Sequence, residues 1–395
     1  MRTYKHRHSP KRVQKRAIRG EDILWFAMLA IVICIIVLAL NGASVDVHDE
    51  IVEVGTEYQS ESTITWLGMD FSDRVRVNGE VNTKVVGTYT LEYYFLGKTY
   101  IKNVSVVDTT KPIFILIGEE TVEVSLSIDE FVDPGFYVVD NYDEDLTSQV
   151  KTHMEQVGNT EYVVTYSVSD SSGNFSQIER HVKVKVGTVY LTFDDGPSST
   201  VTPQVLDILE KNDITATFFL VGYSSGLDEI VLREYSAGHT IGLHGYSHVY
   251  SEIYTSVDAL MENFQKISDQ VYETTGGYRS EIIRFPGGSS NTVSRNFSTG
   301  IMTLAVQTVA DNGYKYFDWN VDSCDAGGAD KSEQIYQNVT QTLKPGNNIV
   351  LMHDSGGHQA TVDALQKIID YCRENGYDFK PIDSETPEVH HGIAN

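Results

Sequence analysis

The chain has 395 residues, enough for two or three domains, and 41% of them are hydrophobic, so ordinary globular cores can form. Its 55 acidic side chains outnumber its 30 basic ones, for a formal net charge of -25. That excess argues against a nucleic-acid partner, because phosphate binding needs a basic surface. Three cysteines, one of them inside an apolar run, exclude a disulfide-rich scaffold.

The N-terminus combines a basic tail with an apolar segment. Residues 1–22 carry eight Lys and Arg side chains, and residues 23–40 carry no charge. Eighteen residues span about 27 Å as a helix, close to the thickness of a bilayer's hydrocarbon core. The basic tail predicts a cytoplasmic N-terminus and a single-pass anchor in the cell membrane, with the remaining chain extracellular. A cleaved signal peptide is the alternative, although Asn41-Gly42-Ala43 matches a cleavage site poorly.

Two β-rich modules follow, predicted at residues 45–110 and 111–187. Both contain alternating β-branched and aromatic residues, the pattern of half-buried strands. The best-matched runs, 88–95 and 162–168, repeat at a spacing of 73 residues. We therefore expect two small β-sandwich modules.

The second module resembles bacterial immunoglobulin-like surface repeats. The resemblance rests on the segments Asp133-Pro-Gly-Phe136, Asp140-Asn-Tyr-Asp-Glu-Asp-Leu146 and Val168-Ser-Asp-Ser-Ser-Gly173, and the first module shares it only through its later strands. Such modules usually act as spacers or weak cell-wall binders. The acidic residues Asp140, Asp143, Glu144 and Asp145 form either a solvated turn, which we favour, or a calcium site.

The remaining residues, 188–395, alternate short apolar runs with amphipathic helical patterns. This alternation predicts a parallel α/β sheet, open or closed into a barrel, with its chemistry at the carboxyl ends of the strands. The predicted strands are 189–193, 216–221 and 348–352, and the predicted helices are 203–211, 257–271 and 362–372.

The first polar motifs of this domain are an acidic pair and a pair of histidines. Asp194 and Asp195 follow the first strand directly, where two adjacent carboxylates are costly unless a cation or a proton separates them. A plain Asp-Gly-Pro turn would explain the same residues. His244 and His248 are four residues apart, so one helical turn could bring both to one metal ion. With one aspartate they would suit a catalytic zinc or another divalent transition metal.

Three further motifs come at later strand ends. Arg284 opens the segment Arg-Phe-Pro-Gly-Gly after a predicted strand and could pair with a carboxylate. The segment from Asp318 to Asp325 is rich in carboxylates, and His353 follows the late apolar strand. Each motif alone has an ordinary explanation, such as a histidine near the surface with its hydrogen bonds satisfied.

Together and in this order, the five motifs resemble the polysaccharide deacetylase family, also called the NodB-homology domain or carbohydrate esterase family 4. The resemblance implies a distorted (β/α) barrel over residues 187–380. It also implies that Asp194 is the general base and that Arg284 orients this base and keeps it ionised. Asp195, His244 and His248 are the implied ligands of Zn²⁺ or another divalent transition metal. His353 is the implied general acid, with Asp325 as its carboxylate partner. The implied substrate-binding residues are Pro286, Gly287, Leu351 and Trp319, with the Gly287 N–H facing the oxyanion and Leu351 lining the acetyl pocket.

The chain departs from the family at three positions. The family usually has Ser or Thr where Gly245 stands, and its hydroxyl ties the loop to the second histidine. An aromatic often replaces Gly287, and Trp usually stands at Ala326. We expect a looser metal loop and a barer sugar groove, which Trp319 or Tyr316 could fill.

The resemblance implies an acetylated polysaccharide as substrate. Anchoring and β spacers favour hydrolytic N-deacetylation of peptidoglycan N-acetylglucosamine in the cell wall. Chitin-like or poly-N-acetylglucosamine glycans are an alternative, and a catalytically silent surface carbohydrate-binding or adhesion protein is another. The sequence leaves the oligomeric state open.

Overall fold

A computed structural model describes residues 20–394. The N-terminal helix α1 (Gly20–Asn41) contains the predicted anchor and buries none of its side chains. Among the described residues it is the one helix whose length and apolar composition suffice to cross a membrane, a test that a signal sequence also passes. Most of the predicted cytoplasmic tail, residues 1–19, lies outside the described residues.

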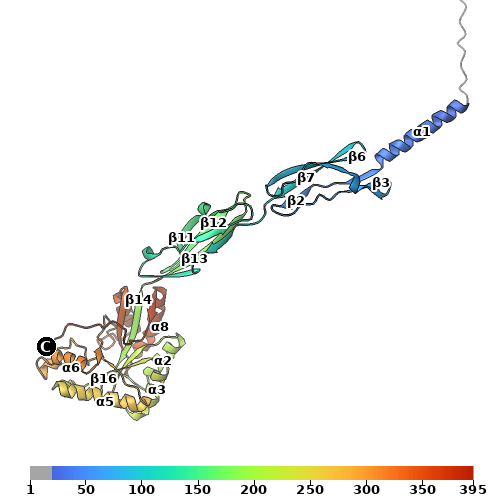
Figure 1. Ribbon diagram of the computed structural model, residues 1–395. Coiled ribbons are helices and arrows are strands. Elements are labelled where there is room, and N and C mark those ends of the chain that lie inside the picture. Colours follow the sequence, from blue (N-terminus) through green and yellow to red (C-terminus); the bar gives the residue numbers. More distant parts are fainter. Residues whose placement is uncertain (1–19, 395) are drawn as a thin grey trace, which may run out of the picture. The chain divides into compact units, whose positions relative to one another are not determined.

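The first β-rich region contains two sheets, and its strands β2, β3, β6 and β7 are labelled in Figure 1. The larger has the order β2-β7-β6-β5, and its centre is a long hairpin in which Tyr93 and Val104 are fully buried. Tyr93 and Val104 point to one face of the hairpin, as period-two alternation requires. The strands are β1 (Ala43–Asp46), β2 (Glu50–Glu53), β3 (Thr63–Trp66), β4 (Met69–Asp70), β5 (Arg76–Asn78), β6 (Gly87–Phe95) and β7 (Lys98–Val107).

The second β-rich region also contains two sheets, with the orders β11-β12-β13-β9 and β10-β8. Strand β12 buries Val164, Tyr166 and Val168. Each lies 73 residues after a buried side chain of β6, namely Leu91, Tyr93 and Phe95. The repeat inferred from the sequence therefore extends to the buried face. The strands are β8 (Ile113–Leu116), β9 (Thr121–Ser125), β10 (Phe136–Val139), β11 (Lys151–Gln156), β12 (Glu161–Ser169) and β13 (Phe175–Lys185).

The acidic loop of this second region is a hydrogen-bonded turn. Asp140 accepts hydrogen bonds from the backbone N–H groups of Tyr142 and Asp143, and Asp145 accepts one from Thr147. These contacts agree with the favoured interpretation for Asp140 and Asp145. The Asp143 side chain instead accepts from the N–H of Ser171 in a different loop.

The C-terminal domain is built on an eight-stranded sheet, whose strands β14 and β16 are labelled in Figure 1. Its order is β18-β17-β16-β15-β14-β20-β19, with β21 pairing the start of β14, and its pairs are parallel. Its strands are β14 (Gly187–Asp194), β15 (Thr217–Val221), β16 (Thr240–Gly245), β17 (Ile282–Ile283), β18 (Lys315–Tyr316), β19 (Val321–Asp322), β20 (Gly346–His353) and β21 (Tyr377–Phe379). The sheet order does not close, since β18 and β19 do not pair within the described residues.

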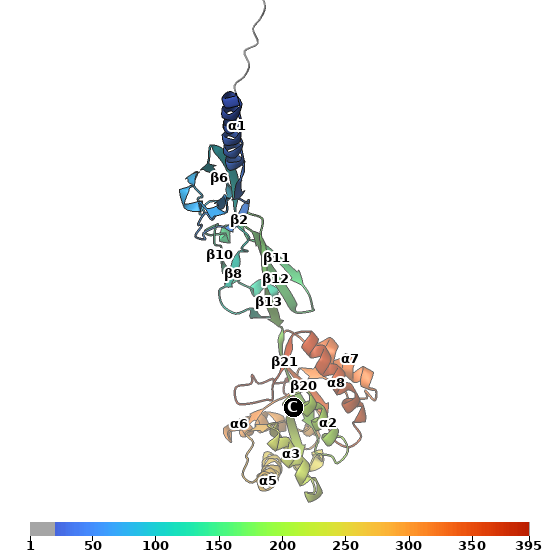
Figure 2. The ribbon, with the colours of Figure 1, turned by 90° about the vertical axis from the view of Figure 1, so that its right-hand side faces the viewer.

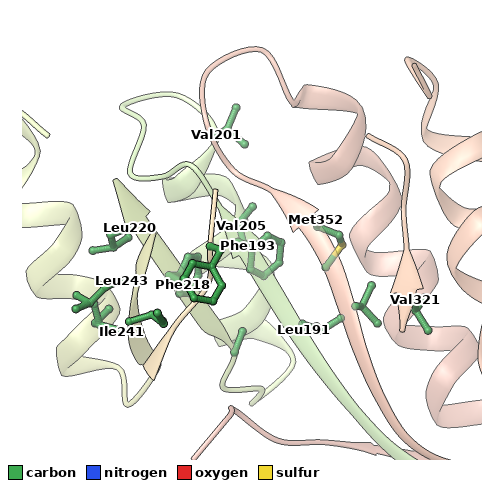
Figure 3. Packing of buried hydrophobic residues seen from close by; sticks show 14 of the residues in the cluster. Leu191, Phe193, Val201, Val205, Phe218, Leu220, Ile241, Leu243, Val321 and Met352 are labelled. Atoms are coloured by element: carbon green, nitrogen blue, oxygen red, sulfur yellow. The ribbon is translucent and has the colours of Figure 1, made fainter. Parts of the chain in front are cut away.

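Helices surround this sheet, and Figure 2 shows α7 and α8 beside β20 and β21. Strand β14 is buried at all eight positions, as a central parallel strand is expected to be, and its core side chains include Val189, Leu191 and Phe193. Side chains from the strands and the helices meet in one core, where Phe193 and Phe218 stack at 5.2 Å (Figure 3). The helices are α2 (Thr202–Lys211), α3 (Asp228–Ser236), α4 (Tyr250–Ile253), α5 (Val257–Thr275), α6 (Ile301–Asp311), α7 (Ser332–Thr342) and α8 (Gln359–Glu374). The structure confirms the expected α/β class and distorted barrel, the latter as an incomplete barrel whose sheet stays open between β18 and β19 in the described residues.

Candidate functional site

The strand order brings the first and last motifs of the C-terminal domain together. Strands β14 and β20 are parallel neighbours, and their register pairs Asp194 with His353 at the carboxyl ends. His244 is the second-last residue of β16, which is separated from β14 by β15, and Arg284 follows β17 directly. Four segments far apart in sequence therefore place their polar side chains on one edge of the sheet.

Asp194 is held by a buried arginine. Only 2% of Asp194 is exposed, and its Oδ1 accepts a hydrogen bond of 2.8 Å from Nη1 of Arg284, which is fully buried. The guanidinium also donates to the hydroxyl of Thr192 and to the carbonyls of Phe317 and Asp318. Its carbon lies 4.2 Å from the centroid of the Phe219 ring. These contacts fix the guanidinium, so it fixes the carboxylate in turn.

The second aspartate points to a different set of partners. Asp195 adopts a left-handed backbone conformation, with φ of 66°, which is uncommon outside glycine. Its Oδ1 lies 3.6 Å from Nε2 of His244 and 3.8 Å from Nε2 of His248. One donor atom from each of these three residues lies within 4.8 Å of the other two. The turn at Asp195 thus directs its carboxylate toward both histidines, whereas Asp194 binds Arg284 and approaches only His244, with its Oδ2 3.8 Å from Nε2.

The histidine pair does not use the helical turn that its spacing suggested. His244 lies on strand β16, and His248 lies in the loop before α4. Gly245, with φ of 97°, turns the chain between them. The expectation that one helical face presents both rings was wrong in its geometry, and a strand end followed by a glycine turn brings the rings to 5.3 Å instead.

Three observations show that the residues present fit a bound cation. The Asp195 Oδ1 is buried and has no hydrogen-bond donor among the described residues. The Nδ1 of His244 lies 2.8 Å from the carbonyl oxygen of Arg284, which places the proton on Nδ1 and leaves the Nε2 lone pair toward Asp195. Burial lowers the pKa of His244 and keeps the imidazole in the neutral form that binds metals.

His353 is paired with Asp325, as the sequence suggested. The His353 Nδ1 lies 2.7 Å from Oδ1 of Asp325, and the His353 N–H donates to Oδ2 at 2.7 Å. The Thr361 hydroxyl donates to the same Oδ2. Burial lowers the pKa of His353, but the Asp325 hydrogen bond and the nearby aspartate charges outweigh it and raise that pKa to about 9. The Asp325 carboxylate therefore favours the protonated form of the His353 imidazole.

A buried asparagine supports the loop between His244 and His248, next to Gly245. Asn263, on α5, donates from Nδ2 to the Ser247 carbonyl and accepts from the Ser247 N–H at Oδ1. A Cβ at Gly245 would lie 2.4 Å from that Nδ2. The expected loosening is thus countered by a tie from a helix. Sequence reasoning missed Asn263. The available hint was its position on the apolar face of the helix, between the core residues Leu260 and Phe264.

Gly287 also lies against a side chain that leaves no room for a Cβ. Gly287 is exposed and has φ of 78°, and a Cβ there would lie 2.3 Å from the hydroxyl of Tyr250. The Tyr250 ring packs edge-on against the His248 ring at 5.4 Å. Tyr250 therefore brings an aromatic ring beside Gly287, and sequence reasoning missed it as well. Ala326 is exposed.

The other predicted substrate-binding residues surround the same edge. Leu351 lies two residues before His353 on β20, so both side chains point to one face of the sheet. Trp319 is half-buried, with its ring centroid 5.7 Å from the Arg284 guanidinium. Pro286 is buried, and its carbonyl accepts from the Tyr254 hydroxyl. Tyr316 is buried, and its ring stacks on the His390 ring with the centroids 3.8 Å apart, so Tyr316 does not take the substrate-facing role suggested for it.

Two buried acids behind the site were not anticipated. Asp354 follows His353, is fully buried and accepts a hydrogen bond of 2.5 Å from the Thr202 hydroxyl. Burial and the charge of Asp194 raise its pKa to about 7. Glu234, on α3, is also fully buried, and burial raises its pKa well above the usual range. Acidic residues are usually exposed, so the sequence did not indicate that Asp354 and Glu234 are buried.

Comparisons with known proteins agree with this geometry. The family model described as polysaccharide deacetylase matches residues 181–301, and the bacterial surface protein immunoglobulin-like domain matches residues 39–102 and 114–184. A peptidoglycan N-acetylglucosamine deacetylase of Bacillus cereus is 32% identical over 53% of this chain and 74% of its own. The peptidoglycan N-acetylmuramic acid deacetylase PdaA of Bacillus subtilis is 30% identical over 50% and 71%.

A solved structure covers the same region. The catalytic domain of a peptidoglycan N-acetylglucosamine deacetylase from Eubacterium rectale is 39% identical, with a TM-score of 0.50, and the match covers 53% of this chain and 94% of that one. The chain belongs to the polysaccharide deacetylase family, and its N-terminal part carries bacterial surface immunoglobulin-like modules.

Proposed function

We propose that this protein is a metal-dependent hydrolase that removes the N-acetyl group from N-acetylglucosamine of peptidoglycan. The observation that carries the proposal is the pair of groups at one sheet edge. Asp195, His244 and His248 converge within 4.8 Å, and the Asp325–His353 pair lies at the end of the strand beside Asp194. Amide hydrolysis can proceed through a metal ion together with a general acid and a general base, and these residues could provide all three functions.

Asp195, His244 and His248 would hold Zn²⁺ or another divalent transition metal, because two imidazoles and one carboxylate leave coordination positions open. Such an ion supplies Lewis acidity toward the acetamide carbonyl and makes water more acidic. Arg284 does not contact the metal group directly in this scheme. Its role is to hold Asp194 in place through the 2.8 Å hydrogen bond.

Asp194 and His353 divide the proton transfers between them. Asp194 is proposed as the general base that accepts a proton from the attacking water, and Arg284 holds its carboxylate in position. His353, kept protonated by Asp325, is proposed to donate a proton to the amine leaving group. The two side chains are neighbours across β14 and β20, so both can reach one acetamide.

The acetyl group and the sugar are proposed to lie over the loop after β17. The Gly287 N–H would donate to the oxyanion, a contact worth about 3 kcal/mol when well placed. Leu351 would contact the acetyl methyl, while Pro286 and Trp319 would line the sugar groove together with Tyr250. The substitution of Gly for an aromatic at position 287 is compensated on this view by Tyr250.

The peptidoglycan substrate and the location are supported by the N-terminal half. An apolar helix of 22 residues and two surface-type β regions precede the domain, and relatives carry names that specify peptidoglycan deacetylation. We therefore propose a single-pass anchor at residues 23–40, modules at 45–110 and 111–187, and a catalytic domain at 188–395 facing the cell wall.

The test is acetate release by the full-length protein in detergent, reloaded with zinc. Purified peptidoglycan, chitin oligomers and poly-N-acetylglucosamine are compared, and sugar analysis tells N-acetylglucosamine from N-acetylmuramic acid products. We expect release from peptidoglycan N-acetylglucosamine that a chelator abolishes. Asp194→Asn should lose turnover and keep zinc, whereas Asp195→Asn should lose zinc. Preferred cleavage of chitin would refute the substrate, and no release from any glycan would leave the binding protein as the function.

A further inference from the structure

Three carboxylates meet in the β-rich part of the chain, away from the site described above. One oxygen each of Asp108, Asp143 and Asp170 lies within 4.8 Å of the others. Asp108 directly follows β7, Asp143 lies in the acidic loop, and Asp170 directly follows β12. Three segments separated by 35 and 27 residues thus bring negative charges together.

Burial makes this arrangement costly without a cation. Asp108 is 6% exposed and Asp170 is 7% exposed. No Lys, Arg or His among the described residues forms an ion pair with any of the three aspartates. Buried charges of one sign are normally neutralised by a partner or a metal.

The hydrogen bonds of the cluster leave a buried oxygen unused. Asp108 accepts from the Thr110 N–H at Oδ1, but its Oδ2 is buried and has no donor among the described residues. Asp143 uses Oδ2 for the Ser171 N–H, and Asp170 accepts from the backbone and the side chain of Asn174. A buried carboxylate oxygen that no donor reaches is the atom that a cation would satisfy.

We propose that Asp108, Asp143 and Asp170 form a calcium site. All three ligands are hard carboxylate oxygens, which Ca²⁺ prefers, and no histidine or cysteine that would favour a transition metal belongs to the cluster. Waters complete the six to eight oxygens that Ca²⁺ takes. The site differs from the one considered from sequence, because only Asp143 of the acidic loop takes part.

Calcium at this site would fix three chain segments to one another. Asp108 belongs to the connection that leads from β7 to β8, and the other two ligands lie in loops around β10 and β12. The carbonyl of Asp108 already accepts from the Asn174 side chain. Calcium binding would therefore stabilise this β-rich region, whatever reaction the C-terminal domain performs.

The test uses the full-length protein in detergent, freed of metal and reloaded with one equivalent of zinc. Calorimetric titration with CaCl₂ should show one further site, with a Kd on the order of 10⁻⁴ M, typical of extracellular modules. About 5 mM CaCl₂ should raise the first thermal transition by about 10 °C. Asp108→Asn and Asp143→Asn should each weaken binding at least tenfold and reduce the shift to less than half.

Glu144→Gln is the matched control, since it removes one negative charge from the same loop at an exposed position outside the cluster. It should bind calcium within twofold of the parent. Without calcium, Asp108→Asn should melt no lower than the parent, because it relieves repulsion. If Asp108→Asn does not fold, half-buried Asp143→Asn decides the matter. No saturable calcium binding, equal binding by Asp143→Asn, or magnesium bound as tightly as calcium would overturn the proposal.

Discussion

The Asp325 carboxylate sets the acidity of His353, so its charge should govern the alkaline side of the reaction. In Asp325→Asn the imidazole loses its anionic partner, and its pKa should fall from about 9 toward its ordinary value. The alkaline limb of the kcat/KM profile should then move to lower pH. At pH 8 the variant should be about 100-fold slower, within the range for loss of general acid catalysis.

Zinc content serves as the control for this variant, because Asp325 is not one of the proposed metal ligands. A bound cation opposes part of the rise in the pKa of His353, so parent and variant are compared with equal zinc. A variant that is slower at every pH by the same factor, with no displaced limb, would show that Asp325 only supports structure.

Restoring the family's residue at position 245 should harm this protein. In Gly245→Ser the side chain would meet Asn263 at 2.4 Å on a backbone with φ of 97°. We expect a loss of about 2 kcal/mol in the free energy of unfolding and weaker zinc binding. Zinc titration and chemical denaturation measure both. Gly226→Ser, in the short 3-10 helix Ser225–Leu227 where the nearest atom lies 3.8 Å away, is the control and should change neither.

The residue scale also shows what the sequence could and could not provide. Asp194, Asp195, His244, His248, Arg284 and His353 were identifiable because their residue types and order form a recognisable pattern. Asn263 and Tyr250 were not, since their roles depend on the space left by Gly245 and Gly287, which only tertiary packing defines. A polar residue on an apolar helix face was the one available hint.

At the scale of elements, strands β14 and β20 were predictable from their apolar runs. Their register was not, because parallel pairing depends on contacts between segments 150 residues or more apart. The position of His244 on a strand was missed for a related reason. A spacing of four residues fits a helix, and only the turn at Gly245 allows it on a strand end.

The junction of β20 and α2 should make stability depend on pH. Asp354 has a pKa of about 7 in the folded protein and about 4 in an unfolded chain. Between these values the folded state holds more protons, so stability falls as pH rises from about 4 to about 7. Thermal unfolding of metal-free protein should follow this direction. Asp354→Asn should flatten the decline, and Glu273→Gln, at an exposed position of α5, should keep it. The buried Glu234, whose pKa is also raised, leaves a smaller decline, so a decline of unchanged size in Asp354→Asn would refute the contribution of Asp354.

For the whole molecule, helix α1 is expected to decide where the enzyme works. A chain that retains residues 1–41 should sediment with membranes and resist carbonate extraction, because about 27 Å of apolar helix is buried in lipid. A chain that begins at residue 42 behind a cleavable signal should appear in the medium with its activity intact. A mature protein whose measured N-terminus lies after residue 41 would instead identify α1 as a signal sequence.

The boundary of the catalytic domain should lie earlier than the proposed residue 188. Strand β14 begins at Gly187, and Val186 before it donates to the Gly376 carbonyl at 2.7 Å and accepts from the Gly346 N–H at 3.0 Å. A fragment 188–395 lacks both hydrogen bonds and the Lys185–Asp378 ion pair.

We expect the fragment 181–395 to exceed 188–395 in its free energy of unfolding by about 2 kcal/mol, since each backbone hydrogen bond contributes about 1 kcal/mol. Chemical denaturation measures the difference. Lys185→Ala in the longer fragment is the matched control and should cost less than about 1 kcal/mol, because the ion pair is one-third exposed. If Lys185→Ala accounted for the whole difference, the ion pair and not the Val186 backbone would hold the start of the sheet. Because β14 carries Asp194 at its other end, the shorter fragment should also release acetate more slowly.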